Sequence, residues 1–195
     1  VVVVGHGAEQ VTKKVQEQAP AWANVSFVEQ SVQAGTGDAA LVGLSALPGA
    51  GLDDDLDDTS TVVVLPGDTP LLQAATLDAL VAAHNANEYA ATLITSVLDD
   101  PTGYGRVVRA PSKHGDGRVL RIVEQRDADE SERAIQEVCT SMYAFRRDLL
   151  GPALRHLSPD NVQGEYYLTD VIGTLATMGH RIGCVQAPPA ETQGV

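Results

Sequence analysis

Short runs of apolar residues alternate along the chain with longer segments in which apolar and polar residues follow a helical period. Runs of aliphatic and β-branched residues bounded by Gly, Pro or Asp are typical of strands buried in a sheet. Strands that alternate with helices predict an α/β fold, in which helices cover a central sheet. The predicted strands are residues 1–4, 25–28, 61–65, 91–97, 119–123, 138–145 and 181–185.

Three of the intervening segments predict helices. One has apolar positions spaced i, i+3, i+4, i+7, with Thr76 placed to cap its start. Its buried face would consist of Leu77, Leu80, Val81 and His84. Residues 38–47 have a similar density of Ala, Leu and Val, and residues 165–178 predict a third helix. That third helix would carry Tyr166, Tyr167 and Thr169 near its start.

The chain opens inside a predicted strand, because four valines lead directly into Gly5-His6-Gly7. A native domain rarely begins without a residue of lead-in. We therefore expect that further sequence precedes Val1 in the natural protein.

The formal charge of −13, from 13 basic and 26 acidic residues, disfavours a nucleic-acid partner, since binding phosphates requires clustered Lys and Arg. Cys139 and Cys184 lie far apart with no CxxC pair, which indicates neither a disulfide framework nor a zinc site and fits a reducing, cytoplasmic setting. No apolar run reaches the roughly 20 residues of a membrane span. The predicted protein is soluble, with no membrane partner.

Asp68 is the first candidate for chemistry. It follows the strand at residues 61–65 through Pro66-Gly67, and in open α/β sheets ligands bind beyond the carboxyl ends of the strands. Mg²⁺ takes oxygen ligands and needs only one or two protein carboxylates when nucleotide phosphates and water complete its shell. From spacing alone, a plain capping role for Asp68 in the turn or the next helix is the favoured interpretation, because Asp often takes such positions.

A second candidate is the Gly-rich segment Gln30-Ser-Val-Gln-Ala-Gly35-Thr36-Gly-Asp38, between a short strand and a helix. Its glycines permit close approach of a ligand, and its Gln and Thr side chains offer the donors and acceptors that read a base edge. It matches neither GxxxxGK[ST] nor GxGxxG, so a simple strand-to-helix turn remains an alternative.

Two further segments carry polar groups at bends. Residues 99–106, which include Gly105, form a loop that can present amides to a ligand or serve as a hairpin turn. Glu124 ends the predicted strand at 119–123, where it can accept hydrogen bonds from sugar hydroxyls or simply lie on the surface. The five aspartates of residues 51–60 lack the Gly and Glu spacing of a calcium loop, which favours a solvated surface loop.

Taken together, five motifs resemble the uridyltransferase domain of the bacterial bifunctional N-acetylglucosamine-1-phosphate uridyltransferase/glucosamine-1-phosphate acetyltransferases. They are QSVQAGTGD, LPGDTPL, DDPTGYGR, IVEQRDA and NVQGEYYLTD, and they span nearly the whole chain. The resemblance implies a Rossmann-like nucleotide-diphospho-sugar transferase fold with a mixed central sheet, a bacterial cytoplasm, and supply of a precursor for peptidoglycan and lipopolysaccharide. The implied reaction is direct displacement, in which N-acetylglucosamine 1-phosphate attacks the α-phosphorus of UTP, forming UDP-N-acetylglucosamine and releasing pyrophosphate.

The resemblance also implies residue roles. The uracil would be held by Gln30, Gly35 and Thr36, and Mg²⁺ at the nucleotide phosphates by Asp68, with Pro66 and Gly67 beside it. The N-acetylglucosamine moiety would be contacted by Gly105, Glu124, Tyr167 and Thr169.

Several features depart from the family pattern. No segment here matches the Gly-rich sequence with Arg and Lys that binds the triphosphate, and the leading strand is missing. The chain stops one residue before an Asn that supplies a second magnesium ligand, and Cys139 stands where the family usually has Asn. The acetyltransferase domain, through which the family enzymes form homotrimers, is absent as well. We therefore expect residues 1–195 to form a partial nucleotidyltransferase domain with little activity alone.

Two other functions stay open at this point. Another sugar-1-phosphate nucleotidylyltransferase, acting on glucose or mannose phosphate, would share the strand-Asp architecture. A noncatalytic module that binds a nucleotide sugar would share the binding residues without turnover.

Overall fold

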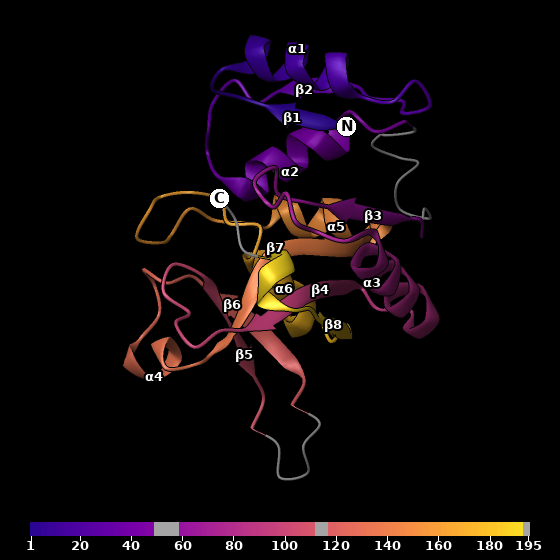
Figure 1. The fold of residues 1–195 in the computed structure, drawn as a ribbon. Coiled ribbons are helices and arrows are strands. Elements are labelled where there is room, and N and C mark those ends of the chain that lie inside the picture. The colour runs from indigo at the N-terminus through magenta and orange to yellow at the C-terminus, as the bar shows by residue number, and fades with distance from the viewer. Residues whose placement is uncertain (49–58, 112–116, 193–195) are drawn as a thin grey trace.

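The computed structural model describes residues 1–48, 59–111 and 117–192. Its main element is a mixed six-stranded sheet in the order β6-β5-β7-β4-β8, with β3 also paired to β7 (Figure 1). The strands of this sheet are β3 (Thr61–Val64), β4 (Ala91–Val97), β5 (Gly105–Arg109), β6 (Val119–Val123), β7 (Glu137–Arg146) and β8 (Ile182–Gln186). The predicted α/β class with a mixed central sheet is confirmed.

The long strand β7 organises this sheet. On one side, its first half pairs with β5 and its second half with β3; on the other side it pairs with β4 along most of its length, and all three pairings are antiparallel. β4 in turn pairs with β8 in parallel. Residues 98–104, which join β4 to β5, therefore pass across the start of β7, so they are not the hairpin turn considered as an alternative above.

Helices bury both faces of the sheet. Alternate residues of a strand point to opposite faces, and β7 sends Tyr143 and Phe145 into one core while Met142 and Ala144 enter the other. The first core is completed by α2, α5 and α6, and the second by α3. The helices are α1 (Ala8–Gln18), α2 (Thr36–Ser45), α3 (Ala74–Asn87), α4 (Glu130–Arg133), α5 (Arg147–Arg155), α6 (Asp170–Thr177) and α7 (Pro189–Thr192).

The first part of the chain forms a separate layer, which Figure 1 shows above the main sheet. Two parallel strands, β1 (Val2–Val4) and β2 (Phe27–Glu29), make a small sheet whose register pairs Val4 with Glu29. Helix α2 packs against both β1 and α5, so it joins this layer to the rest of the molecule.

The predicted strands are confirmed with shifts of one or two residues at several ends. The strand β5 and the helices α1, α5 and α7 were not predicted. Two helix predictions are wrong in detail: Thr76 lies inside α3, whose N-cap is Gln73, and the helix expected at 165–178 begins only at Asp170. The acidic segment expected to form a surface loop lies almost wholly outside the described residues.

Within the described ranges, no helix has the length and apolar character that crossing a membrane requires.

Candidate active site

The Gly-rich segment before α2 and the segment before α6 pack directly against each other. The Tyr166 amide donates to the Ala34 carbonyl (2.8 Å), and the Gly37 amide donates to the Tyr166 carbonyl (2.7 Å). The Thr36 hydroxyl oxygen accepts from the Leu168 amide (3.0 Å). Residues more than a hundred positions apart are thus held together by backbone groups and the Thr36 hydroxyl.

Glycine is required at the centre of this contact. Gly35 has φ +114°, a conformation that side chains disfavour, and a Cβ there would lie 2.6 Å from the Tyr166 carbonyl oxygen. A Cβ on Gly37 would lie 2.5 Å from Leu157 Cδ1. The glycines of GTG therefore allow the two segments to approach this closely.

A cavity of about 380 Å³ opens beside this contact. Its lining consists of Gly5, His6, Gln30, Gln33, Gly35, Thr36, Ala39 and Glu165. Gln30 Nε2 donates to Asp38 Oδ2 (2.7 Å) and to the Gly35 carbonyl (3.1 Å), which fixes the amide and leaves its Oε1 without a donor among the described residues. Because Thr36 uses its oxygen as an acceptor, its hydroxyl hydrogen can still be donated. Gln30 and Thr36 thus offer an acceptor and a donor, which a pyrimidine edge can use.

A second, larger cavity of about 630 Å³ lies between β6, α6 and residues 160–167. Glu124 and Tyr167 both line it. The Thr169 hydroxyl donates to Glu124 Oε1 (2.8 Å), and this bond ties the end of β6 to the start of α6. Tyr167 is only 6 % exposed.

The absence of a side chain at Gly105 leaves space beside the Glu124 carboxylate. A Cβ on Gly105 would lie 2.8 Å from Ile122 Cγ2 and 3.5 Å from both carboxylate oxygens of Glu124. Gly105 also pairs with Cys139 across β5 and β7. Glycine at this position keeps the carboxylate accessible from the β5 side.

Charge in the larger cavity is mainly negative. Its acidic lining residues are Glu124, Asp127, Glu132, Asp160 and Asp170, with Arg121 paired to Glu132. Burial raises the pKa of Glu124, an effect that the Thr169 hydrogen bond opposes. Burial also raises the pKa of Asp170, with a smaller contribution from the neighbouring charge of Asp127. Such a lining accepts hydrogen bonds from sugar hydroxyls and repels phosphate groups, so phosphates would lie outside this cavity.

Cys139 is buried close to this site, and burial raises the pKa of its thiol to about 12. The thiol donates to the Tyr143 hydroxyl (3.2 Å). A protonated thiol already engaged in this way lacks the paired donor and acceptor of an Asn amide.

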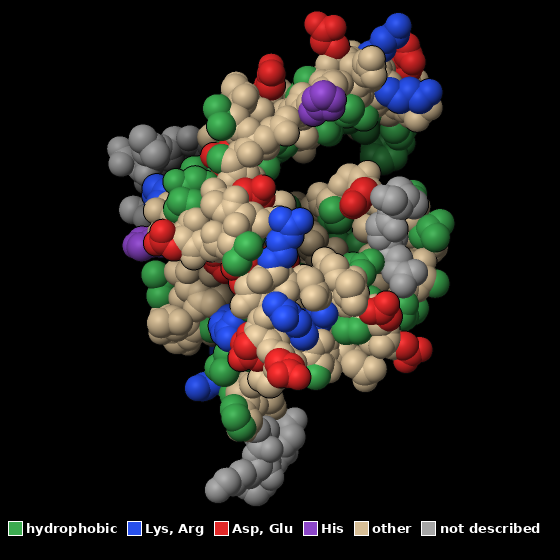
Figure 2. Space-filling model, turned by 90° about the vertical axis from the view of Figure 1, so that its left-hand side faces the viewer, with side chains coloured by type: hydrophobic (Ala, Val, Ile, Leu, Met, Phe, Trp, Pro, Cys, Tyr) green, Lys and Arg blue, Asp and Glu red, His purple; other side chains and the backbone are tan. Residues whose placement is uncertain are grey.

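The 165–167 segment connects the two cavities, because Glu165 lines the smaller one and Tyr167 the larger. Figure 2 shows that the surface is hollowed between the N-terminal layer and the rest of the molecule. The smaller cavity lies at this junction, since all of its lining except Glu165 comes from the N-terminal layer.

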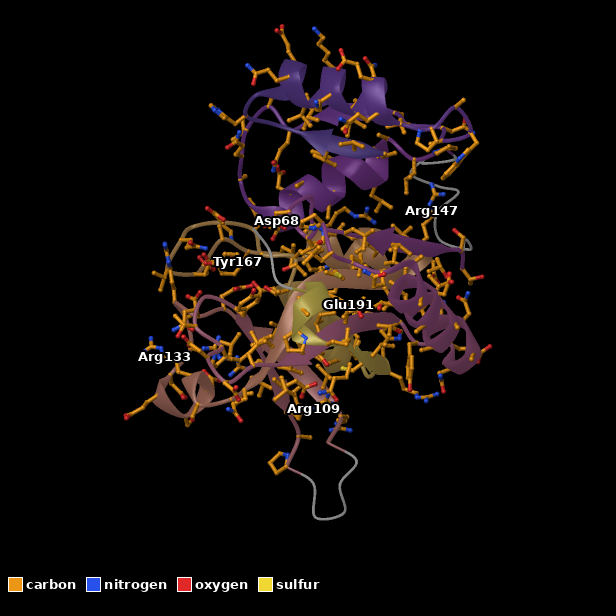
Figure 3. The ribbon with its side chains drawn as sticks, in the orientation of Figure 1. Asp68, Arg109, Arg133, Arg147, Tyr167 and Glu191 are labelled. Carbon is orange, nitrogen blue, oxygen red and sulfur yellow. The ribbon has the colours of Figure 1, made fainter. Side chains whose placement is uncertain are left out.

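Asp68 is not brought into either cavity. It is exposed in the bend after β3 and makes no hydrogen bond or ion pair with other described residues. Pro66 is half-buried and Gly67 exposed, and neither lines a cavity. Figure 3 shows Asp68 between the N-terminal layer and the main sheet, on the side of the molecule where Tyr167 lies. No group of three or more His, Cys, Asp or Glu in the described ranges could hold a metal ion by itself.

The structure thus gathers Gln30, Gly35 and Thr36 around one cavity, while Glu124 and Tyr167 line the other. Thr169 donates to Glu124, and Gly105 lies beside that carboxylate, but neither residue lines the cavity itself.

A profile for the family described as "Nucleotidyl transferase" matches residues 1–188. The chain belongs to the nucleotidyl transferase family.

Curated relatives within this family share close sequence similarity with the chain. The bifunctional protein GlmU of Thermobifida fusca is 44% identical over 196 residues, and that of Streptomyces coelicolor is 47% identical over 183 residues. These alignments cover 100% and 94% of this chain but only 38% and 35% of the two relatives. This nucleotidyl transferase chain therefore spans little more than a third of the length of those proteins.

Solved structures support the nucleotidyl transferase fold. UDP-glucose pyrophosphorylase complexed with UDP-glucose has a TM-score of 0.63 at 15% identity, covering 93% of this chain and 65% of that one. The apo form of UDP-glucose pyrophosphorylase gives 0.64 at 16% identity, with 94% and 71% covered. These similarities bear on the fold alone and confirm the predicted nucleotide-sugar transferase architecture.

Sequence reasoning missed one residue that lines a cavity of this nucleotidyl transferase and one that supports the loop before β5. His6 lines the smaller cavity directly after β1, where the strand-end rule that selected Asp68 would have found it. Arg106 is 1 % exposed and holds the loop before β5, but its buried position within GYGR could not be recognised while those residues were interpreted as a loop.

Proposed function

We propose that this chain is the greater part of a uridyltransferase domain that joins UTP to N-acetylglucosamine 1-phosphate, forming UDP-N-acetylglucosamine and pyrophosphate. The observation that carries the proposal is the pairing of two cavities across residues 165–167. One offers the donor and acceptor of Gln30 and Thr36, and the other offers the buried carboxylate of Glu124. The GlmU proteins, 44–47% identical in the two cases given above, support this assignment.

In this function the two cavities divide the substrates. The uracil binds at Gln30, Gly35 and Thr36, and the N-acetylglucosamine ring binds beside Glu124, Gly105 and Tyr167. Thr169 orients the Glu124 carboxylate through its 2.8 Å hydrogen bond and keeps it an acceptor for sugar hydroxyls.

The reaction is a direct displacement without a covalent enzyme intermediate. An oxygen of the sugar phosphate attacks the α-phosphorus of UTP, and pyrophosphate leaves with the bond between the α- and β-phosphates broken. Positioning and charge neutralisation supply the rate enhancement. The acidic lining of the larger cavity favours an arrangement with the phosphates outside it, towards the strand ends.

Asp68, beside Pro66 and Gly67, is the residue proposed to hold Mg²⁺. An exposed carboxylate with no partner in the described part of the chain fits an ion that keeps waters and phosphate oxygens in its shell. Bound there, Mg²⁺ would neutralise charge on the nucleotide phosphates.

The wider setting belongs to the same proposal. The product is a precursor of peptidoglycan and lipopolysaccharide, the compartment is the bacterial cytoplasm, and the complete protein carries an acetyltransferase domain and forms homotrimers. Residues 1–195 include no counterpart of the triphosphate-binding segment with Arg and Lys. We therefore expect weak turnover from this chain alone.

Pyrophosphate release from UTP tests the proposal. We would compare N-acetylglucosamine, glucose and mannose 1-phosphates, with and without Mg²⁺, using this chain and the complete reading frame. The proposal expects turnover with the first sugar, dependent on Mg²⁺ and lost in Asp68→Asn but not in Asp78→Asn, an exposed residue of α3. Preference for glucose or mannose 1-phosphate would overturn the assignment of N-acetylglucosamine 1-phosphate as the substrate. Binding of UDP-N-acetylglucosamine without turnover in the complete protein would indicate a noncatalytic module.

A further inference from the structure

His6 leaves the small N-terminal sheet at the same edge as Gln30. Strands β1 and β2 are parallel, with Val4 paired to Glu29, so the residues that follow them emerge side by side. The backbone amide of Gln30 donates to the Val4 carbonyl (2.8 Å), which fixes the segments that follow β1 and β2 relative to each other. The crevice beyond the carboxyl ends of parallel strands is where α/β folds bind ligands.

The backbone that carries His6 is fixed on both sides. The Ala8 amide donates to the Gly5 carbonyl (3.1 Å), and Gly7 is the left-handed N-cap of α1 with φ +71°. A Cβ on Gly5 would lie only 3.0 Å from Gln33 Nε2, so this turn packs closely on the Gln33 side chain. His6 itself is exposed and lines the 380 Å³ cavity.

His6 differs chemically from the other residues around this cavity. Among the described residues that line it, His6 alone carries a ring, while Gln30 and Thr36 supply edge-reading groups and Gly35 and Ala39 supply small surfaces. A flat base has two kinds of surface to recognise, its hydrogen-bonding edge and its face. Gln30 and Thr36 can form hydrogen bonds with the edge of the base, and the His6 ring can pack against its face.

We infer that His6 is a substrate-binding residue that packs its imidazole ring against the face of the nucleobase. The inference rests on the proposed function and deepens it, because it assigns a contact to the nucleotide substrate and none to the sugar phosphate. Packing against a face is tolerant of base identity, so His6 contributes affinity while Gln30 and Thr36 contribute the choice of uracil.

Three substitutions separate the ring from its polar atoms. His6→Ala removes both, His6→Phe keeps a flat ring, and His6→Asn keeps polar atoms without a ring. His156→Ala is the matched control, since His156 is exposed and lines neither cavity. Circular dichroism and thermal melting would establish that all four variants fold like the parent protein.

The experiment measures KM for UTP, CTP and the sugar phosphate in the complete reading frame, together with UDP-N-acetylglucosamine binding by calorimetry. In His6→Ala and His6→Asn, KM for UTP is expected to rise roughly tenfold, the magnitude of a lost base-stacking contact. KM for the sugar phosphate and the preference for UTP over CTP should stay unchanged. His6→Phe should restore KM for UTP to near the parent value.

Two outcomes overturn the inference while the proposed function survives. One is a His6→Ala protein whose KM for UTP equals that of His156→Ala, and the other is an equal rise for UTP and the sugar phosphate. Failure of the parent protein itself to bind a uridine nucleotide or to use UTP would instead refute the proposed function, and the assignment of His6 with it.

Discussion

At the scale of single residues, burial of the Glu124 carboxyl group has a cost in stability. Burial raises the pKa of its carboxyl group above the ordinary value for Glu, so the folded chain disfavours the charged form relative to the unfolded chain. The free energy of unfolding therefore decreases as pH rises from the ordinary Glu pKa of the unfolded chain to the raised pKa of the folded chain. Above the raised pKa the destabilisation is fully present. Two contributions oppose this rise in pKa: the hydrogen bond from Thr169 and, more weakly, the charge of Arg106.

Glu124→Gln should therefore raise the melting temperature at neutral pH while weakening sugar binding. The Gln oxygen can still accept from Thr169, but the loss of charge should raise KM for the sugar phosphate roughly tenfold, as for a hydrogen bond to a charged group. The gain in melting temperature should shrink on acidification, as the parent Glu124 takes up its proton. A gain that stays constant from neutral pH down to the ordinary Glu range would contradict this account.

Cys139 gives a second prediction at this scale. Because burial raises the thiol pKa to about 12 and the thiolate is the reactive form, Cys139 should resist iodoacetamide in the native protein at mildly alkaline pH. Mass spectrometry after digestion should find it alkylated only when urea is added first. Rapid labelling of Cys139 under native conditions, with Cys184 in the same sample as the internal comparison, would show that it is accessible.

At the scale of secondary-structure elements, the packing of α3 on β4 should be sensitive to acid. His84 is 2 % exposed, its Nδ1 lies 3.0 Å from Thr92 Oγ1, and its Nε2 is buried without a partner among the described residues. Burial, and secondarily the charge of Arg146, lowers its pKa. The unfolded chain binds a proton at about pH 6.5 while the folded chain does not, so stability falls as pH drops below that value.

The double variant His84→Leu/Thr92→Val removes the imidazole and replaces its hydroxyl partner with an isosteric methyl group. Urea unfolding of the parent protein should show a midpoint that decreases between neutral pH and about pH 5, and this decrease should be smaller in the double variant. His156→Ala serves as the control, because it removes an exposed His rather than a buried one. If the urea midpoint of the double variant decreased with acidification as much as that of the parent protein, the acid sensitivity would belong to other groups.

The loop between β4 and β5 depends on Arg106. Its guanidinium donates to the Tyr104 carbonyl and to Gln125 Oε1 (2.6 Å), and Gln125 also accepts from the Gly103 amide (3.4 Å). Lys cannot span both acceptors with one ammonium group. Arg106→Lys should cost about 1–3 kcal/mol for the buried bonds left unmade and speed hydrogen exchange in residues 99–105. Arg109→Lys, at a more exposed ion pair with Glu137, should change exchange in that loop little.

The elements also show how far the sequence could predict the structure. β4, β6 and β7 were placed almost to the residue, because these strands are rich in aliphatic, β-branched and aromatic residues. Helix α1 was missed because its sequence, AEQVTKKVQEQ, has only Val11 and Val15 as larger apolar positions, and none of its residues is buried. The helix at 165–178 was predicted too long because Tyr166 is held by backbone bonds to Ala34 and Gly37, which local periodicity cannot reveal. The same limit applies to the site, since nothing in the sequence indicated that Gly35 meets the Tyr166 backbone.

At the scale of the whole molecule, one contact joins the N-terminal layer to the segment between the two cavities. Gly35 packs against the Tyr166 backbone there, and the Thr36 hydroxyl accepts from the Leu168 amide. The next residue, Thr169, donates to Glu124. A disturbance at Gly35 should therefore reach both cavities. Residues 165–169 thus tie the geometry of the smaller cavity to the geometry of the larger one.

Gly35→Ala tests this connection. The new Cβ would lie 2.6 Å from the Tyr166 carbonyl oxygen, a backbone atom that cannot rotate away, so residues 165–169 must shift. Gly179→Ala is the matched control, since Gly179 has φ +87° with no atom within 4 Å of a Cβ and so carries the backbone strain alone, worth about 1–2 kcal/mol. Gly35→Ala should lower the free energy of unfolding by about 1–3 kcal/mol more than this control, as overpacking does. It should also weaken binding of UTP and of the sugar phosphate together, whereas Gly179→Ala changes neither. Weaker UTP binding with normal sugar-phosphate binding would mean that the two cavities are independent.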